Sequence, residues 1–196
     1  MVIARNRCSG WLVDDNSVME ESIEWKSHEL MKPPQISLEK ILLLEPACLR
    51  MTVPEAYGDE NGHMNVRWYA AVFDEAGDIL HARLGLTPEF HRTHRTGTMD
   101  LENHLNYLHE VRAGDRLAIF SRIVAHSAKR MQYLMFMVND TTGSLSAIFE
   151  CINAFADLKL RKTAPFPPEI ATKIEAGVAA SAVLDWPPPV CGVMSA

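Results

Sequence analysis

Residues 58–85 read GDENGHMNVRWYAAVFDEAGDILHARLG, in which a turn runs directly into the pattern of one long helix. The first part is rich in Gly, Asp and Asn, which favour turns, and Asn65 is suited to cap a helix that begins at Val66. Apolar residues then recur every three or four positions as far as Leu84, and Gly85 follows where a helix would end. The stretch therefore predicts a helix over 66–84 whose broad apolar face must pack against another layer.

The sequence on either side of this helix predicts strands. Upstream, Leu49, Met51 and Val53 alternate with polar residues, which is typical of a half-buried strand that Pro54 ends. Beyond a polar loop over 86–98, turn residues separate four segments with strand patterns, at 99–111, 117–126, 131–138 and 145–160. The second and third segments are apolar on both faces, as strands between two layers would be. One long helix against consecutive antiparallel strands predicts an α+β fold with a sheet of about five strands.

The two ends of the chain differ from this patterned part. Residues 1–45 are rich in Asp and Glu and are interrupted by two prolines, so we expect an acidic N-terminal extension with one short helix over 16–31. A second short helix is predicted to open at Pro168 and to end near Ala176. Residues 177–196 lack periodicity and predict an irregular C-terminal tail. The folded domain is thus expected to span 46–176.

Charge and cysteine content exclude several classes of function. The 196 residues carry a net charge of −6, so no overall positive field attracts nucleic acid or an anionic membrane surface. No run approaches the roughly 20 apolar residues of a spanning helix, and no basic stretch with an apolar core marks an exported chain. The four cysteines are scattered without the spacing of metal ligands. We therefore expect a cytoplasmic protein with reduced thiols and no bound metal.

The turn before the long helix has the composition of an active site. A carboxylate (Asp59), an imidazole (His63) and an amide (Asn65) immediately precede the first backbone N–H groups of the helix. Those N–H groups and the helix dipole can hold a carbonyl oxygen that gains negative charge during acyl transfer. A nearby carboxylate can activate water or attack the carbonyl itself. Spacing alone nevertheless favours an ordinary capped turn, because Asp, Asn and Gly are the commonest turn residues.

A family resemblance favours the catalytic interpretation. The pattern Asp-x-x-Gly-His-x-Asn over 59–65, followed by a long helix and four strands, resembles the hot-dog fold acyl-CoA thioesterases of the 4-hydroxybenzoyl-CoA thioesterase type. The resemblance extends over about 47–170, including Gly114-Asp115 between strands and the basic, Pro-containing exit at 161–167. The block LENHLNYLHEV at 101–111, together with 61–63, resembles the betainyl-CoA thioesterases of carnitine breakdown, which also occur fused to carnitine dehydrogenases.

The resemblance implies roles for the residues of the turn. Asp59 would be the catalytic carboxylate, as general base or nucleophile, and the backbone N–H of Val66 would polarise the thioester carbonyl. His63 and Asn65 would shape the loop or orient water. Val66-Arg67 stands where the family often has a second Asn, so the role of that amide is lost here. Some relatives use a Glu on the helix instead, but Glu75 falls opposite the apolar stripe and is expected at the surface.

The same resemblance suggests how the acyl group is bound. Glu102 would suit a trimethylammonium group, with His104 on the same face of its strand, although a solvated sheet face explains both residues equally well. Trp68 or Tyr69 could add a cation–π contact, whereas aromatic residues at helical spacing more often serve as core.

The remaining implications concern coenzyme A and assembly. Lys129 and Arg130, in a turn between strands, would bind the CoA phosphates, unless they are ordinary charged residues of a hairpin.

The family resemblance also implies hydrolysis without a cofactor, with coenzyme A only as part of the substrate. It implies a homodimer or a dimer of dimers as well. An open edge strand gives such a domain a physical reason to pair.

Two other functions fit the same fold. An acyl-thioester dehydratase generally relies on an Asp/His pair, and His63 near Asp59 leaves that reaction open. A noncatalytic acyl-CoA-binding module would share the pocket and the phosphate contacts without depending on Asp59. The position of the Asp on the turn before the helix favours the thioesterase.

Overall fold

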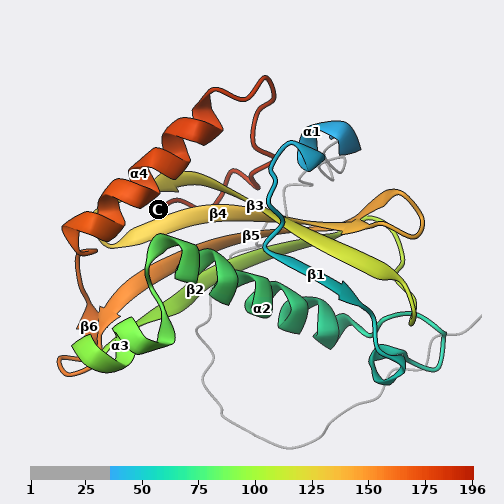
Figure 1. The fold of residues 1–196 in the computed structure, drawn as a ribbon, viewed down its shortest axis with the longest axis horizontal. Helices are drawn as coiled ribbons and strands as arrows, with labels where there is room; N and C mark the ends of the chain where they lie inside the picture. Colours follow the sequence, from blue (N-terminus) through green and yellow to red (C-terminus); the bar gives the residue numbers. More distant parts are fainter. Residues whose placement is uncertain (1–35) are drawn as a thin grey trace, which may run out of the picture. The chain divides into compact units, whose positions relative to one another are not determined.

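The computed structural model describes residues 36–196, which form a curled antiparallel sheet with one long helix lying along one face (Figure 1). The helix expected over 16–31 lies outside these residues. The helical elements are α1 (Leu38–Leu42), η1 (Glu55–Tyr57), α2 (Val66–Leu84), α3 (Pro88–His94) and α4 (Pro168–Ala182). The strands are β1 (Leu49–Thr52), β2 (Thr96–Tyr107), β3 (Arg116–His126), β4 (Arg130–Asn139), β5 (Ser144–Asp157) and β6 (Lys162–Thr163).

Helix α2 begins and ends where the sequence predicts. The Asn65 side chain accepts a hydrogen bond from the N–H of Arg67, and Gly85 ends the helix at a φ of 103°, which favours glycine. The apolar face of the helix is buried against the sheet, with Phe73 only 1% exposed and stacked on Phe149 of β5. Burying a side chain of this size stabilises the fold by about 1.5–3 kcal/mol.

The sheet has the order β1-β3-β4-β5-β2, with β6 paired to β5, and every pairing is antiparallel. All five predicted strands are present, although those predicted over 99–111 and 145–160 end earlier, at Tyr107 and Asp157. The predicted loop over 86–98 is wrong. Its residues form α3 and the start of β2, because Thr87 accepts a hydrogen bond from the N–H of Phe90 and Pro88 occupies the first helical turn.

The central strands β3 and β4 are buried on both faces, as their composition predicts. One face packs on α2, and α4 lies against β3. The opposite, outer face is covered by Ile41 of α1 and by Trp186 of the C-terminal segment, which is residues 183–196. The Trp186 ring lies 5.6 Å from the ring of Phe136 in β4. Ile41 belongs to the part of the chain that the sequence predicts to be an acidic extension (1–45), so part of that extension contributes to the core. Helix α4 ends at Ala182, six residues beyond its predicted end at Ala176.

Strand β2 forms one edge of the sheet and carries exposed apolar side chains. Its pairing with β5 is irregular between Asp100 and Glu102, and the Met99 and Leu101 side chains are 60% and 47% exposed. Beyond the irregularity the side chains alternate, so Leu105 and Tyr107 face α2 while His104 points to the outer face. Within the described part of the chain, no helix is long and apolar enough to cross a membrane.

Candidate active site

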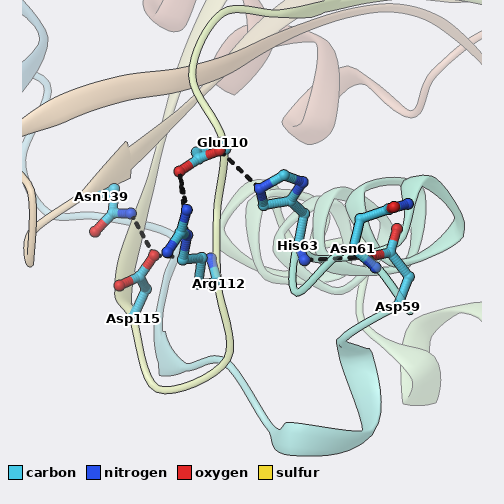
Figure 2. Close-up of polar contacts among 7 residues, drawn as sticks. All are labelled: Asp59, Asn61, His63, Glu110, Arg112, Asp115 and Asn139. Carbon is cyan, nitrogen blue, oxygen red and sulfur yellow. Dashed lines mark hydrogen bonds and ion pairs between the residues drawn. The ribbon is translucent and has the colours of Figure 1, made fainter.

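The turn at 59–63 holds the Asp59 carboxylate with backbone hydrogen bonds (Figure 2). Its Oδ1 accepts from the N–H groups of Asn61 and His63 at 2.8 and 3.2 Å. Gly62 permits this tight turn with a φ of 76°. Because hydrogen bonds to the charged form favour ionisation, these two N–H groups lower the pKa of Asp59 below its ordinary value. The turn thus presents an ionised carboxylate beside the start of α2.

The His63 side chain points away from Asp59 and toward the segment that follows β2. Its Nε2 lies 2.8 Å from Oε2 of Glu110, whose other oxygen accepts from Arg112 at 2.7 Å (Figure 2). The Met64 N–H also donates to the carbonyl of Val111 at 2.6 Å. These bonds fix the turn against residues 110–112. The imidazole therefore positions the turn, and within the described residues the His63 side chain bonds to Glu110 and not to the Asp59 carboxylate.

The segment beyond Glu110 is held in turn by Asp115. The Asp115 carboxylate accepts from the N–H of Arg112 and from the Asn139 side chain, both at 2.8 Å. Asn139 lies at the end of β4, so the hydrogen bonds connect the turn at 59–63 to the sheet (Figure 2).

The first turn of α2 leaves a backbone donor exposed. Asn65 caps the N–H of Arg67 at 3.2 Å and donates its own N–H to the carbonyl of Tyr57. Val66 is 59% exposed, and its N–H has no acceptor within residues 36–196. A free N–H at the positive end of a helix is suited to polarise a carbonyl oxygen.

A cleft of about 440 Å³ lies beside this helix start. It has a polar side at the turn and an aromatic side, where the Tyr69 and Tyr107 rings meet edge to face at 5.0 Å. Its lining residues are Asp59, His63, Met64, Val66, Tyr69, Tyr107, Leu108, His109 and Glu110. No local pattern predicts that Tyr107, His109 and Glu110 line this cleft, because only the folded sheet brings the end of β2 over the start of α2.

Several residues that the sequence singled out lie elsewhere. The Trp68 ring stacks on Tyr57 at 4.0 Å and lies under the Arg67 guanidinium at 5.0 Å, so it is already engaged. Glu102 and His104 lie on the outer face of the sheet, opposite the cleft. Glu102 therefore does not face the cleft, as a cation-binding residue of that cleft would, and His104 does not line the cleft either.

Lys129 and Arg130 lie at the far end of the sheet from the turn. Arg130 of β4 and Met99 of β2 both pair with Ala154 of β5, so they lie at the same level of the sheet. Tyr107, which lines the cleft, is eight residues further along β2. That spacing corresponds to about 25 Å. One chain therefore does not bring these cations to the cleft.

Glu75 is exposed on α2, as predicted, and its neighbour Asp74 has the more distinctive surroundings. Asp74 lines a hollow of about 310 Å³ between α2 and β2 with Asp100 and Phe149. Partial burial and the nearby Asp78 and Asp100 carboxylates raise the pKa of Asp74.

Comparison with known proteins connects this arrangement to a family. The sequence model of the Thioesterase-like superfamily matches residues 53–174. Betainyl-CoA thioesterase of Pseudomonas aeruginosa is 31% identical over 129 residues, which are 66% of this chain and 81% of that protein. L-carnitine dehydrogenase/betainyl-CoA thioesterase of Agrobacterium fabrum is 29% identical over 117 residues, which are 60% of this chain and 24% of that protein.

The fold is also shared with a solved structure. A Staphylococcus aureus protein solved in complex with CoA superimposes with a TM-score of 0.68 at 21% identity, over 76% of this chain and 93% of that chain. This likeness, with one helix against a curled antiparallel sheet, confirms the predicted hot-dog architecture. The family match covers more than half of the sequence and includes the turn, α2 and all four long strands. The chain therefore belongs to the thioesterase-like superfamily of thioester hydrolases.

Proposed function

We propose that this thioester hydrolase acts on an acyl-CoA with a small cationic acyl group, betainyl-CoA, and releases betaine and free CoA. The observation that carries the proposal is the 31% identity to a betainyl-CoA thioesterase over 129 residues, which are 81% of that protein. The relative named L-carnitine dehydrogenase/betainyl-CoA thioesterase connects this hydrolysis with carnitine breakdown, so the proposed reaction would belong to that catabolism.

The geometry of the turn supports a mechanism based on Asp59. The thioester carbonyl would accept a hydrogen bond from the Val66 N–H, while the Asp59 carboxylate either takes a proton from water or attacks the carbonyl carbon. In the general-base route, water adds to the acyl carbon, the C–S bond breaks, and the proton taken by Asp59 passes to the CoA sulfur. In the nucleophilic route, the C–S bond breaks as Asp59 forms an anhydride with the acyl group, the CoA thiolate takes up a proton, and water then cleaves the anhydride to free betaine and Asp59. Both routes require an ionised Asp59 carboxylate, and the lowered pKa of Asp59 keeps it in that form.

The cleft offers suitable groups for a trimethylammonium group. In a betainyl group the nitrogen is separated from the carbonyl carbon by a single methylene, so the cation must lie in the cleft that holds the carbonyl. Tyr69 and Tyr107 supply aromatic surface there, and the Glu110 carboxylate lines the same cleft. Aromatic faces and carboxylates both attract a quaternary ammonium ion.

The free edge of β2 supports a homodimer, which would also complete the CoA site. Two identical edge strands related by a two-fold axis pair antiparallel, so the Thr96 end of one β2 would lie beside the Tyr107 end of the other. The Lys129–Arg130 turn lies near the Thr96 end of its own β2, and the cleft lies near the Tyr107 end. In the paired arrangement the turn of the second copy would therefore lie near the cleft of the first. The two cations could then bind the CoA phosphates.

A matched pair of substrates tests the specificity. Tert-butylacetyl-CoA has the shape of betainyl-CoA with carbon in place of the charged nitrogen. We expect the rate of thiol release, expressed as kcat/KM, to be at least about tenfold higher for betainyl-CoA, which corresponds to about 1.4 kcal/mol of cation recognition. Equal values would show that the charge is not recognised, and hydrolysis of neither ester would contradict the choice of substrate.

A further inference from the structure

Three side chains from distant parts of the sequence meet on the outer face of the sheet, opposite the cleft. His104 of β2 and Glu150 of β5 are cross-strand partners, and Cys191 of the C-terminal segment lies over them. One ligand atom from each, an imidazole nitrogen, a carboxylate oxygen and a thiol sulfur, lies within 4.8 Å of the other two. This combination of donors is typical of transition-metal sites and unusual on an ordinary sheet face.

The burial of Glu150 is difficult to explain without a cation. Its side chain is only 2% exposed, and the donors that reach it are neutral, namely the Gln132 side chain at 2.6 Å and the backbone N–H of Cys191 at 2.6 Å. None of the ion pairs found within residues 36–196 includes Glu150. A buried carboxylate is costly unless a positive group or a metal compensates its charge.

The three side chains approach one another without bonding to one another. No hydrogen bond or ion pair joins the side chains of His104, Glu150 and Cys191 to one another in the described structure, although their ligand atoms all lie within 4.8 Å of one another. Ligands of a tetrahedral zinc ion, bound at about 2.0–2.3 Å, are separated by about 3.3–3.8 Å. Closing the cluster around an ion therefore requires shifts of about 1 Å. Two members can move this far, because His104 lies on an edge strand and Cys191 lies outside any helix or strand.

We propose that His104, Glu150 and Cys191 bind a divalent transition-metal ion, with zinc as the best match. Three protein ligands leave the fourth tetrahedral position to water. The ion would compensate the Glu150 charge and fasten the C-terminal segment to the sheet. Because the cluster lies on the face opposite Asp59, the ion takes no part in thioester hydrolysis, and this proposal stands apart from the proposed substrate.

Cobalt titration of the metal-free chain of 196 residues tests the site. We expect one Co²⁺ per chain, with the visible bands of tetrahedral cobalt and a thiolate-to-cobalt charge-transfer band, all displaced by Zn²⁺. Zinc should also protect Cys191 from alkylation, as followed by mass spectrometry of the peptide. The substitutions Cys191→Ser and His104→Gln should each weaken binding by more than about tenfold, since even the loss of an outer hydrogen-bond partner of a ligand costs that much.

Matched substitutions control for other thiols and imidazoles. Cys8→Ser changes a cysteine outside the described residues, and His126→Gln changes an exposed histidine at the end of β3. Both variants should bind Co²⁺ like the unaltered chain. Absence of a stoichiometric cobalt complex, absence of the thiolate band, or undiminished binding by Cys191→Ser would each overturn the proposal.

Discussion

Asp59 keeps its charge because two N–H groups of its own turn, from Asn61 and His63, point at one carboxylate oxygen. These contacts lower its pKa below the ordinary value of 3.8. In the proposed mechanism the active form is the carboxylate, so activity should be retained as long as Asp59 stays ionised. We therefore expect kcat/KM to stay level as the pH falls to the ordinary aspartate value and to decline only below it.

A pH profile of kcat/KM, with circular dichroism at each pH to confirm that the protein remains folded, measures this directly. An acid limb well above the ordinary aspartate pKa, in protein that is still folded, would contradict the described environment of the carboxylate.

At the scale of single residues, the sequence predicts what is local. Asp59, Asn65 and Val66 belong to one turn, and their proximity follows from a few adjacent positions. Tyr107 and Glu110 join the cleft through strand pairing, which no spacing within one segment reveals. Trp68 shows the converse case, because its helical position is correct but its ring is engaged by Tyr57.

At the scale of elements, helix α2 buries an imidazole that its surroundings do not satisfy. His81 is 7% exposed, and its Nε2 has no hydrogen-bond partner among the described residues. Burial lowers the pKa of His81 below the ordinary 6.5, more than the nearby Asp100 and Asp78 raise it. In the unfolded chain the imidazole regains its ordinary pKa. Below pH 6.5 the unfolded state thus binds a proton that the folded state does not, and stability declines as the pH falls.

The substitution His81→Leu should remove this dependence. We expect the free energy of unfolding of the unaltered chain to fall between pH 7 and about pH 5.5, by no more than about 1.4 kcal/mol per pH unit from this group, and the variant to show a smaller slope. Urea unfolding at several pH values measures both slopes. His94→Leu, at an exposed position on α3, should keep the original slope. Identical slopes for the His81 variant and the unaltered chain would contradict this account.

The elements themselves differ in how far the sequence predicts them. Helix α2 follows from its apolar period, its cap and Gly85, which all agree. Helix α3 is missed because seven mostly polar residues show no apolar period, although Thr87-Pro88 carries a start signal. The irregularity of β2 and the continuation of α4 to Ala182 depend on packing against other elements and leave no local pattern.

At the scale of the whole molecule, the proposed dimer predicts a link between assembly and CoA binding. Leu101→Lys would place like charges near the two-fold axis of paired β2 edges, and we expect a monomer by sedimentation velocity. KM for the thioester should then rise by about tenfold or more, because each charged hydrogen bond to phosphate contributes about 1.5 kcal/mol or more. The double substitution Lys129→Ala, Arg130→Ala should raise KM to a similar extent while the protein remains dimeric.

Val183→Lys is the control for the change of charge, because Val183 is 83% exposed beyond α4 and away from the β2 edge. It should stay dimeric with unchanged KM. A monomeric Leu101→Lys variant with the original KM would contradict the shared CoA site, and a parent protein that sediments as a monomer would contradict the dimer. Neither assembly nor a site shared between copies can be predicted from local patterns in one chain.

The role of Asp59 in hydrolysis is tested most directly by the turnover of betainyl-CoA by Asp59→Asn, with Glu60→Gln as the control. Both substitutions remove one negative charge from the same turn and nearly preserve side-chain size, but only Asp59 lines the cleft. We predict that kcat falls by at least about 100-fold in Asp59→Asn, because the carboxylate that activates water or attacks the carbonyl is gone, and that it changes little in Glu60→Gln. Thiol release at the parent rate by a folded Asp59→Asn protein would show that Asp59 is not the catalytic carboxylate.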